Sequence, residues 1–284
     1  MKTGLVLEGG GARGIYTAGV LDVFLEEGLG EAFDGLIGVS AGGIHGCSFL
    51  SGQKGRSIRY SKKYSSDPRF MSFRSFLKTG DIVGADFCYR LLPETLDPYD
   101  NDAFLKSKTA FYVVCSNVET GEAEYILMKD MNKDIHYLRA SASLPYFSRL
   151  VELDGKKYLD GGCTDSIPVR AFQHMGYDKN VVVLTQDCSY RKKPEMEKLT
   201  RFKYGKYPAF AKVLMNRHVH YNQTVEDILK MEKEGSIFVI RPKAPMEIGR
   251  MEKNPEVIQK TYDLGRQDAL EKLKELKEWL AKDA

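Results

Sequence analysis

The chain has 284 residues, of which 43% are hydrophobic and 29% charged, and its net charge is +3. These values fit one large globular domain, or a domain with an appendage, that buries a sizeable core. The 42 basic and 39 acidic residues are too evenly balanced to indicate a nucleic-acid partner, and we expect none.

The N-terminal part of the chain predicts a strand–helix–strand–helix order. Residues 4–7 form a short apolar run, 9–14 are rich in glycine, and 15–27 show helical spacing of apolar residues. Residues 35–39 form a second apolar run that ends at Ser40, and the next ten residues again have helical character. This order is typical of parallel strands joined by a right-handed crossover.

The middle of the chain is predicted to surround the site. Residues 55–105 are rich in aromatic and basic side chains and are interpreted as helices and loops that cover the site. Two interpretations of this region are possible. It forms either an apolar acyl pocket with a cationic rim, or part of the core, with buried aromatic residues and solvated lysines. Strands are predicted at 109–118, 124–128 and 181–185, a helix at 135–142, and a hairpin over 150–159 that ends at Asp160.

The composition changes after Asp187, and residues 191–194 are interpreted as a linker. Beyond this linker we expect a helix at 200–230, a strand at 236–241 and a long amphipathic helix at 255–282. The last helix is expected to pack on the core; the alternative is that it lies on a membrane surface.

Cysteine content and hydropathy set the expected environment. The five cysteines are far apart in the sequence and form no CxxC pair, which argues against a disulfide framework and a zinc site. We therefore expect reduced thiols, a cytoplasmic location, and no metal or other cofactor. No run of about eighteen apolar residues occurs, so no membrane span is predicted. A peripheral contact with a membrane stays open.

The first motif is a G-x-S-x-G sequence formed by Gly38, Val39, Ser40, Ala41 and Gly42. A serine between a strand and a helix needs a sharp turn, which small neighbours permit, and the turn exposes its hydroxyl group. N–H groups at the start of the helix favour negative charge nearby. On this pentapeptide alone, a nucleophilic serine and a plain turn that caps a helix are both open.

The second motif is a glycine-rich loop of six residues: Gly9, Gly10, Gly11, Ala12, Arg13 and Gly14. Residues without side chains let successive N–H groups converge on an anion. The loop also matches G-x-G-x-x-G, so a nucleotide- or acyl-CoA-binding loop competes with an oxyanion hole. A dinucleotide site needs an acidic residue at the end of the second strand. Because that strand ends in Val39 and Ser40, we prefer the oxyanion hole.

The third motif is Asp160, Gly161 and Gly162, at the end of the predicted hairpin. A carboxylate at a strand end, followed by two glycines, can come close to another part of the backbone. Taken alone, the segment is interpreted as an ordinary Asp-Gly turn.

In this order, the three motifs resemble those of the patatin-like phospholipase family, which joins a G-G-G-x-[RK]-G loop, a G-x-S-x-G turn and a D-G-[GA] turn. The segment from Ala140 to Pro145 is similar to the family's A-S-x-[AS]-x-P, and the likeness covers about residues 3–188. The asparagines that many members carry after the D-G-[GA] turn are absent here, although Pro168 is present.

The resemblance implies an α/β fold, a three-layer sandwich whose mostly parallel central sheet is flanked by helices. It implies a catalytic domain over 1–190, with a mainly helical C-terminal extension over 191–284 packed on the core. By the same resemblance Ser40 is the nucleophile, Asp160 is its base, and backbone amides of the glycine-rich loop form the oxyanion hole.

The implied function is hydrolysis of a phospholipid, a lysophospholipid or a simpler acyl ester through an acyl-enzyme intermediate. A free aspartate has a pKa of about 3.9, so burial has to raise that pKa for Asp160 to act as a base. A Ser-His-Asp triad with His174, His218 or His220 is the alternative for the base. An inactive scaffold with this fold is the alternative for the whole protein, and the sequence predicts no oligomeric state.

Overall fold

The structure, a computed structural model, describes residues 1–282. Its strands are β1 (Thr3–Leu7), β2 (Gly35–Gly38), β3 (Ala110–Asn117), β4 (Ala123–Met128), β5 (Val151–Leu153), β6 (Lys156–Asp160), β7 (Lys179–Val183) and β8 (Ile237–Ile240). Its α-helices are α1 (Ile15–Glu26), α2 (Ala41–Leu50), α3 (Arg56–Tyr64), α4 (Phe73–Thr79), α5 (Asn101–Lys106), α6 (Met131–Ser141), α7 (Val169–His174), α8 (Glu197–Tyr204), α9 (Pro208–Lys233) and α10 (Pro255–Ala281). Short 3-10 helices occur at η1 (Gly11–Gly14) and η3 (Gly161–Cys163), and a π-helix at η2 (Phe87–Leu96).

The strands form a single sheet in the order β5-β6-β3-β2-β1-β7-β8, with β4 paired to β3. The run from β3 through β2, β1 and β7 to β8 is parallel, whereas β4, β5 and β6 are antiparallel additions around β3. The predicted α/β class with a mostly parallel sheet is therefore confirmed. β8 pairs with β7, so the C-terminal part of the chain contributes a strand to this sheet.

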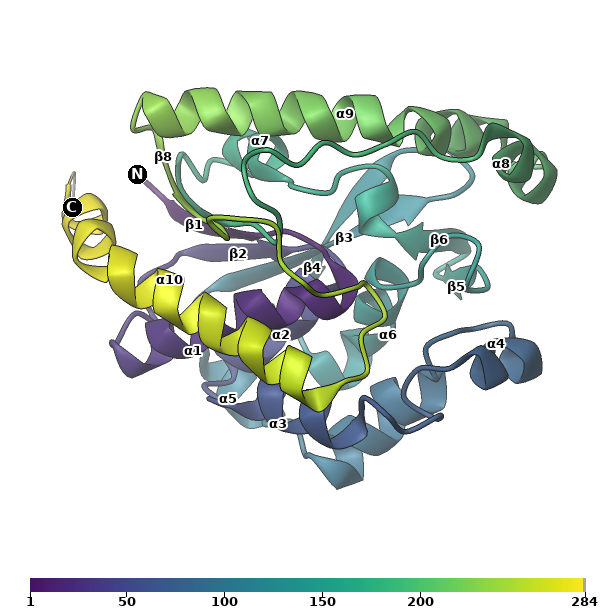
Figure 1. Ribbon diagram of the computed structural model, residues 1–284, viewed down its shortest axis with the longest axis horizontal. Coiled ribbons are helices and arrows are strands. Elements are labelled where there is room, and N and C mark those ends of the chain that lie inside the picture. The colour runs from purple at the N-terminus through teal and green to yellow at the C-terminus, as the bar shows by residue number, and fades with distance from the viewer. Residues whose placement is uncertain (283–284) are drawn as a thin grey trace.

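Helices cover both faces of the sheet, which gives three layers (Figure 1). Successive residues of β1 alternate between the faces: Leu5 and Leu7 join one buried cluster with residues of α1 and α2, and Val6 joins another with residues of α7 and α9. Because both faces of the parallel strands are buried, their sequences are almost continuously apolar. Among the helices in residues 1–282, none combines the length and the apolar character needed to cross a bilayer.

The C-terminal helix α10 packs against α1, as one of the two expectations for it required (Figure 1). Two glycines let the helix backbones touch, since a Cβ on Gly19 would lie 2.1 Å from the carbonyl oxygen of Tyr262, and one on Gly265 only 2.0 Å from that of Tyr16. The Tyr16 hydroxyl also donates a hydrogen bond of 2.8 Å to Asp268. This contact fixes the last helix on the core.

Two details after residue 187 differ from the prediction. The single helix expected at 200–230 is two helices, α8 and α9, because Pro208 lacks an N–H group and starts a new first turn. The expected linker is held against α9: the N–H of Lys192 donates to Asn222 Oδ1 at 2.8 Å, and Asn222 Nδ2 donates to the Lys192 carbonyl at 3.1 Å. The division of the chain at residue 190 stays a prediction.

Candidate active site

Ser40 occupies the turn between β2 and α2 and has φ +53° and ψ −121°, a backbone conformation that few residues other than glycine adopt. Its neighbours have to be small. A Cβ on Gly38 would lie 2.6 Å from the backbone nitrogen of Gly43, and one on Gly42 would lie 2.6 Å from the carbonyl oxygen of Leu7. The strained turn is what a G-x-S-x-G serine needs to present its hydroxyl group.

The sheet brings Asp160 to the same place. β3 pairs on one edge with β4, and on the other edge first with β2 and then with β6. β2 ends with Gly38 opposite Val113, while β6 runs the other way and ends with Asp160 opposite Cys115. The carboxyl ends of β2 and β6 therefore meet head to head along β3. Ser40 and Asp160, which follow and end these strands, line one small cavity.

Both residues are buried, with Ser40 6% and Asp160 3% exposed. Burial raises the pKa of the Asp160 carboxyl group. The charge of Arg217, the nearby Ser40 side chain and the N–H of Gly162, which donates to Oδ1 at 2.8 Å, each oppose that shift. The net pKa is still raised, which brings the carboxylate closer to the basicity that proton transfer requires.

The segment from Ala140 to Pro145 anchors both residues. The backbone N–H of Ser40 donates to Ser141 Oγ at 2.9 Å, and the backbone N–H of Asp160 donates to the Ser143 carbonyl at 2.8 Å. One short stretch of chain thus fixes the turn that carries the hydroxyl and the strand end that carries the carboxylate.

The glycine-rich loop passes directly beside Ser40. A Cβ on Gly9 would lie 3.2 Å from that of Ser40, and one on Gly10 would lie 2.8 Å from Thr185 Oγ1, so larger residues would push the loop away. Within residues 1–282, the N–H groups of Gly9 and Gly10 donate to no protein acceptor. The N–H of Gly11 likewise donates to no protein acceptor in this part of the chain, so three successive backbone donors remain available beside the serine.

The loop also packs against neighbouring segments. Gly11 has φ +59°, and a Cβ there would lie 2.7 Å from the carbonyl oxygen of Arg250. The same carbonyl accepts the N–H of Ala12 at 2.9 Å, so this N–H is not free for an anion. Gly14 is buried, and Arg13 lines the small cavity with Gly9, Gly10 and Gly11.

Two cavities meet at Ser40. The larger, here called the apolar cavity, has a volume of about 570 Å³ and is lined mainly from α2, α3, η2 and α6. Ile44, Tyr60, Phe70 and Leu138 are among its walls. The smaller has about 40 Å³ and contains four cationic side chains, for which it is called the cationic pocket: Arg13, Lys192, Arg217 and Arg250.

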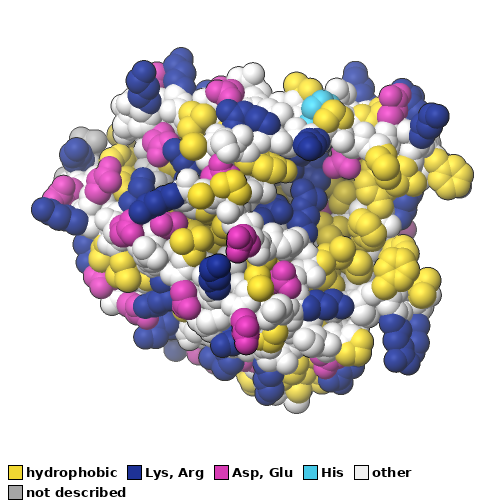
Figure 2. Space-filling model, in the orientation of Figure 1, with side chains coloured by type: hydrophobic (Ala, Val, Ile, Leu, Met, Phe, Trp, Pro, Cys, Tyr) yellow, Lys and Arg dark blue, Asp and Glu magenta, His cyan; other side chains and the backbone are white. Residues whose placement is uncertain are grey.

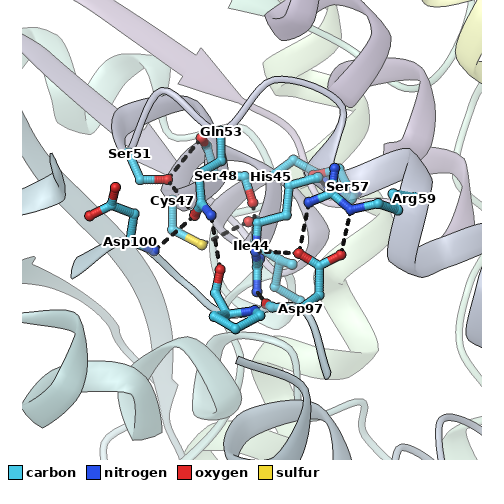
Figure 3. Close-up of polar contacts among 12 residues, drawn as sticks. Ile44, His45, Cys47, Ser48, Ser51, Gln53, Ser57, Arg59, Asp97 and Asp100 are labelled. Atoms are coloured by element: carbon cyan, nitrogen blue, oxygen red, sulfur yellow. Dashed lines mark hydrogen bonds and ion pairs between the residues drawn. The ribbon is translucent and has the colours of Figure 1, made fainter. Parts of the chain in front are cut away.

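For residues 55–105 the sequence left two possibilities, an acyl pocket with a cationic rim or core aromatics with solvated lysines. The structure agrees fully with neither. The aromatic residues of this region do line a cavity beside Ser40, but its arginines form no rim around it. Arg56 is buried and pairs with Asp97, whose carboxylate also accepts two hydrogen bonds from Arg59 (Figure 3). The cations next to Ser40 instead come mainly from the C-terminal third of the chain, and the sequence motifs gave no signal for Lys192, Arg217 or Arg250.

No histidine of the triad alternative approaches Ser40: His174, His218 and His220 line neither cavity. His45 does line the apolar cavity, but its Nδ1 is 2.9 Å from Ser57 Oγ (Figure 3), and burial lowers its pKa to about 4. His45 is therefore a neutral residue of the cavity wall.

Residues 5–172 match the family model described as patatin-like phospholipase, and residues 207–281 match a domain of unknown function, DUF6363. The uncharacterized protein YjjU of Escherichia coli (strain K12) is 29% identical over 273 residues, which are 93% of this chain and 75% of that protein. Lysophospholipase NTE1 of Saccharomyces cerevisiae is 28% identical over 176 residues, which are 61% of this chain and 10% of that enzyme. The chain thus spans about a tenth of the length of such curated lysophospholipases. Among solved structures, VipD from Legionella pneumophila aligns with 96% of this chain and 67% of its own, with a TM-score of 0.45 and 12% identity.

Proposed function

Because this chain belongs to the patatin-like phospholipase family, we propose that it hydrolyses lipid acyl esters with Ser40 as nucleophile and Asp160 as base. Membership of the family supports hydrolysis of lipid esters. The roles of Ser40 and Asp160 go beyond what the family match supports. One observation carries the proposal: a strained serine and a buried carboxylate with a raised pKa stand at the junction of two strands that meet head to head.

The proposed cycle has two halves. The hydroxyl oxygen of Ser40 attacks the ester carbonyl carbon while its proton passes to Asp160, and N–H groups of Gly9, Gly10 and Gly11 hold the oxyanion. The carbon–oxygen bond to the alcohol then breaks, and the alcohol leaves with the proton from Asp160. In the second half a water molecule gives a proton to Asp160 and attacks the acyl carbon. The bond from that carbon to the Ser40 oxygen then breaks, Asp160 returns the proton to this oxygen, and the fatty acid is released.

The apolar cavity supports a lipid substrate. Its volume of about 570 Å³ lies in the range of pockets that enclose a small-molecule ligand. Its walls include Ile44, Tyr60, Phe70 and Leu138. Burial of an acyl chain there gains about 0.8 kcal/mol for each CH₂ group removed from water.

Hydrolysis of a lysophospholipid by purified protein tests the assignment. Ser40→Ala is expected to lower kcat by on the order of 10⁴-fold or more, and His218→Ala, which changes a histidine outside both cavities, is expected to leave kcat unchanged. Full activity of Ser40→Ala, or loss of activity in a folded His218→Ala protein, would rule out the dyad.

We propose that the molecule meets the lipid surface with the end that carries α4 and α8 (Figure 1). Exposed apolar side chains gather at the right of the molecule (Figure 2), the end at which α4 and α8 lie (Figure 1). Phe73 and Leu77 of α4 are 62% and 76% exposed, and Phe202 of α8 is 89% exposed. Side chains of this size at a surface gain free energy when they enter the acyl boundary of a bilayer. This assignment replaces the idea that α10 lies on the membrane.

Sedimentation with phospholipid vesicles tests this contact. Phe73→Ser combined with Leu77→Ser is expected to lower the bound fraction several-fold. Val219→Ser is the matched control, because Val219 is 53% exposed but lies on α9. Equal binding of both variants would contradict the assignment.

A further inference from the structure

The cationic pocket lies beside Ser40, and three of its four cations come from sequence beyond the patatin-like match. Lys192, Arg217 and Arg250 come after residue 172, and only Arg13 comes from the glycine-rich loop. Three of the positive charges are thus an addition that the C-terminal third of this chain makes to the pocket beside Ser40.

These positive charges are poorly compensated. Among the residues that the structure describes, Arg13, Lys192 and Arg250 form no ion pair, and Arg13 Nε is buried without a hydrogen-bond partner. Arg217 has Glu195 at 3.6 Å and donates to the Gly162 carbonyl. Arg13, Lys192 and Arg217 are partly buried and Arg250 is exposed. Like charges gathered around one small cavity repel one another, so the arrangement favours the arrival of an anion.

Two acids line the pocket: Asp160, the proposed base, and Glu8, which is already committed to neutral donors. Glu8 accepts the Tyr221 hydroxyl at 2.7 Å, and it accepts the N–H and the hydroxyl of Thr185 at 2.6 and 3.0 Å. Its hydrogen-bonding capacity is largely used without any of the four cations. Glu8 therefore ties β1, the end of β7 and α9 together beneath the pocket.

Burial, together with repulsion among the cations, lowers the pKa of two of them. Burial and the charges of Arg217 and Arg250 lower the pKa of Lys192 to about 7. Burial and Arg250 also lower the pKa of Arg13. A bound anion would offset this repulsion, because opposite charge stabilises the protonated lysine.

We propose that the cationic pocket binds a phosphate group on the alcohol part of the substrate, while the acyl chain lies in the apolar cavity. This rests on the proposed function. Ser40, Gly11, Leu144 and Arg250 line both spaces, so an ester bond at Ser40 has one space on each side. A water molecule needs roughly 10–15 Å³ of such space, so a cavity of about 40 Å³ holds about three, comparable to the oxygens of a phosphate.

The chemistry also selects the substrate class. Guanidinium groups match phosphate oxygens in pairs, and a lysine adds a point charge. The favoured substrates are acyl esters of a phosphorylated alcohol, such as acyl glycerol phosphate, over uncharged acylglycerols. The phosphate has to lie within a few bonds of the ester, because Ser40 is itself part of the pocket wall.

Paired substrates test this. Acyl glycerol phosphate and monoacylglycerol with the same acyl chain are compared for the wild type, Lys192→Met and the control Lys193→Met, in which an exposed neighbour outside the pocket is changed. The wild type is expected to favour the phosphate ester by at least about tenfold in kcat/KM, the scale of a lost charge-assisted hydrogen bond. Lys192→Met is expected to lose most of this preference, and Lys193→Met to retain it. No preference in the wild type, or equal effects of the two variants, would overturn the proposal.

A binding measurement separates this proposal from the function itself. Ser40→Ala protein is titrated with glycerol phosphate and, separately, with inorganic phosphate, with Lys192→Met in the same background. Binding of glycerol phosphate that Lys192→Met weakens supports the pocket even if no ester is hydrolysed. Binding of inorganic phosphate alone would make this a free-phosphate site and overturn the headgroup assignment, as would binding of neither. The proposed function would instead be contradicted if the wild-type protein showed no hydrolysis of uncharged esters that depends on Ser40.

Discussion

The apolar cavity and the cationic pocket share Ser40 but differ in nearly every other respect. One has about 570 Å³ and is walled mainly by helices between β2 and β5, whereas the other has about 40 Å³ and takes three of its four cations from beyond β7. The junction between them is set by the sheet. The difference teaches that the chemistry, the choice of acyl chain and the choice of alcohol depend on separate segments, which substitutions can address separately.

The largest effect is expected at the junction. Asp160→Asn removes the proposed base but keeps an oxygen that accepts the Gly162 N–H, so kcat should fall on the order of 10³–10⁴-fold for charged and uncharged substrates alike. Initial rates on the paired esters measure this. If kcat fell for only one class of substrate, Asp160 would act in recognition of that class and not in the chemical step common to both.

The same variant carries a prediction on stability. The folded state raises the pKa of Asp160, so it favours the neutral carboxyl group, and this stabilisation is lost as the pH rises from about 3.9 through the raised pKa. Asparagine stays neutral, so Asp160→Asn should gain in Tm relative to the wild type as the pH increases. Thermal unfolding at pH 4 and pH 8 measures the difference, and a gain that shrinks with pH would contradict the sign.

Ser141 positions the proposed nucleophile, because its hydroxyl oxygen accepts the N–H of Ser40 at 2.9 Å. Ser141→Ala leaves that buried N–H without this acceptor, which costs about 1–3 kcal/mol of stability. We expect kcat to fall about 10- to 100-fold with KM little changed, again for both substrate classes. Ser143→Ala is the matched control, since its hydroxyl donates only to the Arg139 carbonyl. Similar kinetics for the two variants would remove the special role of Ser141.

Much of the junction could be predicted from the sequence because its constraints are local. Gly38 and Gly42 stand where a Cβ would collide with backbone atoms, and such turn chemistry is visible in a pentapeptide. The approach of Asp160 is different: it depends on β2 and β6 sharing one edge of β3, and Asp160-Gly161-Gly162 alone resembles an ordinary turn. Family resemblance, not spacing, supplied that pairing.

The cationic pocket could not be predicted. Lys192 stands in a segment interpreted as a linker, and it acquires its place only because Asn222 on α9 holds its backbone. Arg217 and Arg250 lie on α9 and in the segment before α10, without a shared motif. The two-helix nature of 200–230 was missed for a simpler reason, since Pro208 marks a helix start in the sequence itself.

The apolar side has its own prediction. Ser61→Phe adds a ring to the wall of the apolar cavity from α3, so kcat/KM for long-chain esters should fall about tenfold while that for short-chain esters changes little. Lys62→Phe adds the same ring at an exposed neighbouring position and should change neither. A series of esters that differ only in chain length measures this. Equal losses at all lengths would show that the chain lies elsewhere.

The affinity of the cationic pocket for glycerol phosphate should depend on pH, and this is the smallest of the expected effects. Lys192 is protonated below its pKa of about 7, and phosphate, whose second pKa is about 6, favours that form. Other charged or titratable groups also face the pocket: Arg13, Arg217, Arg250, Glu8, Asp160, Tyr190 and Tyr221. The affinity of Ser40→Ala protein for glycerol phosphate should fall several-fold from pH 7 to pH 9. In the Lys192→Met form the titration curve should be nearly flat, and an equal fall in both forms would assign the effect to another group.

Labelling with a fluorophosphonate probe tests the central claim most directly, because the probe forms a bond only with an activated serine. After digestion and mass spectrometry, we expect the wild type to carry the adduct on Ser40 and Asp160→Asn to react far more slowly. Ser40→Ala should carry no adduct. An unmodified Ser40 in folded wild-type protein, or unchanged labelling of Ser40→Ala, would contradict the account.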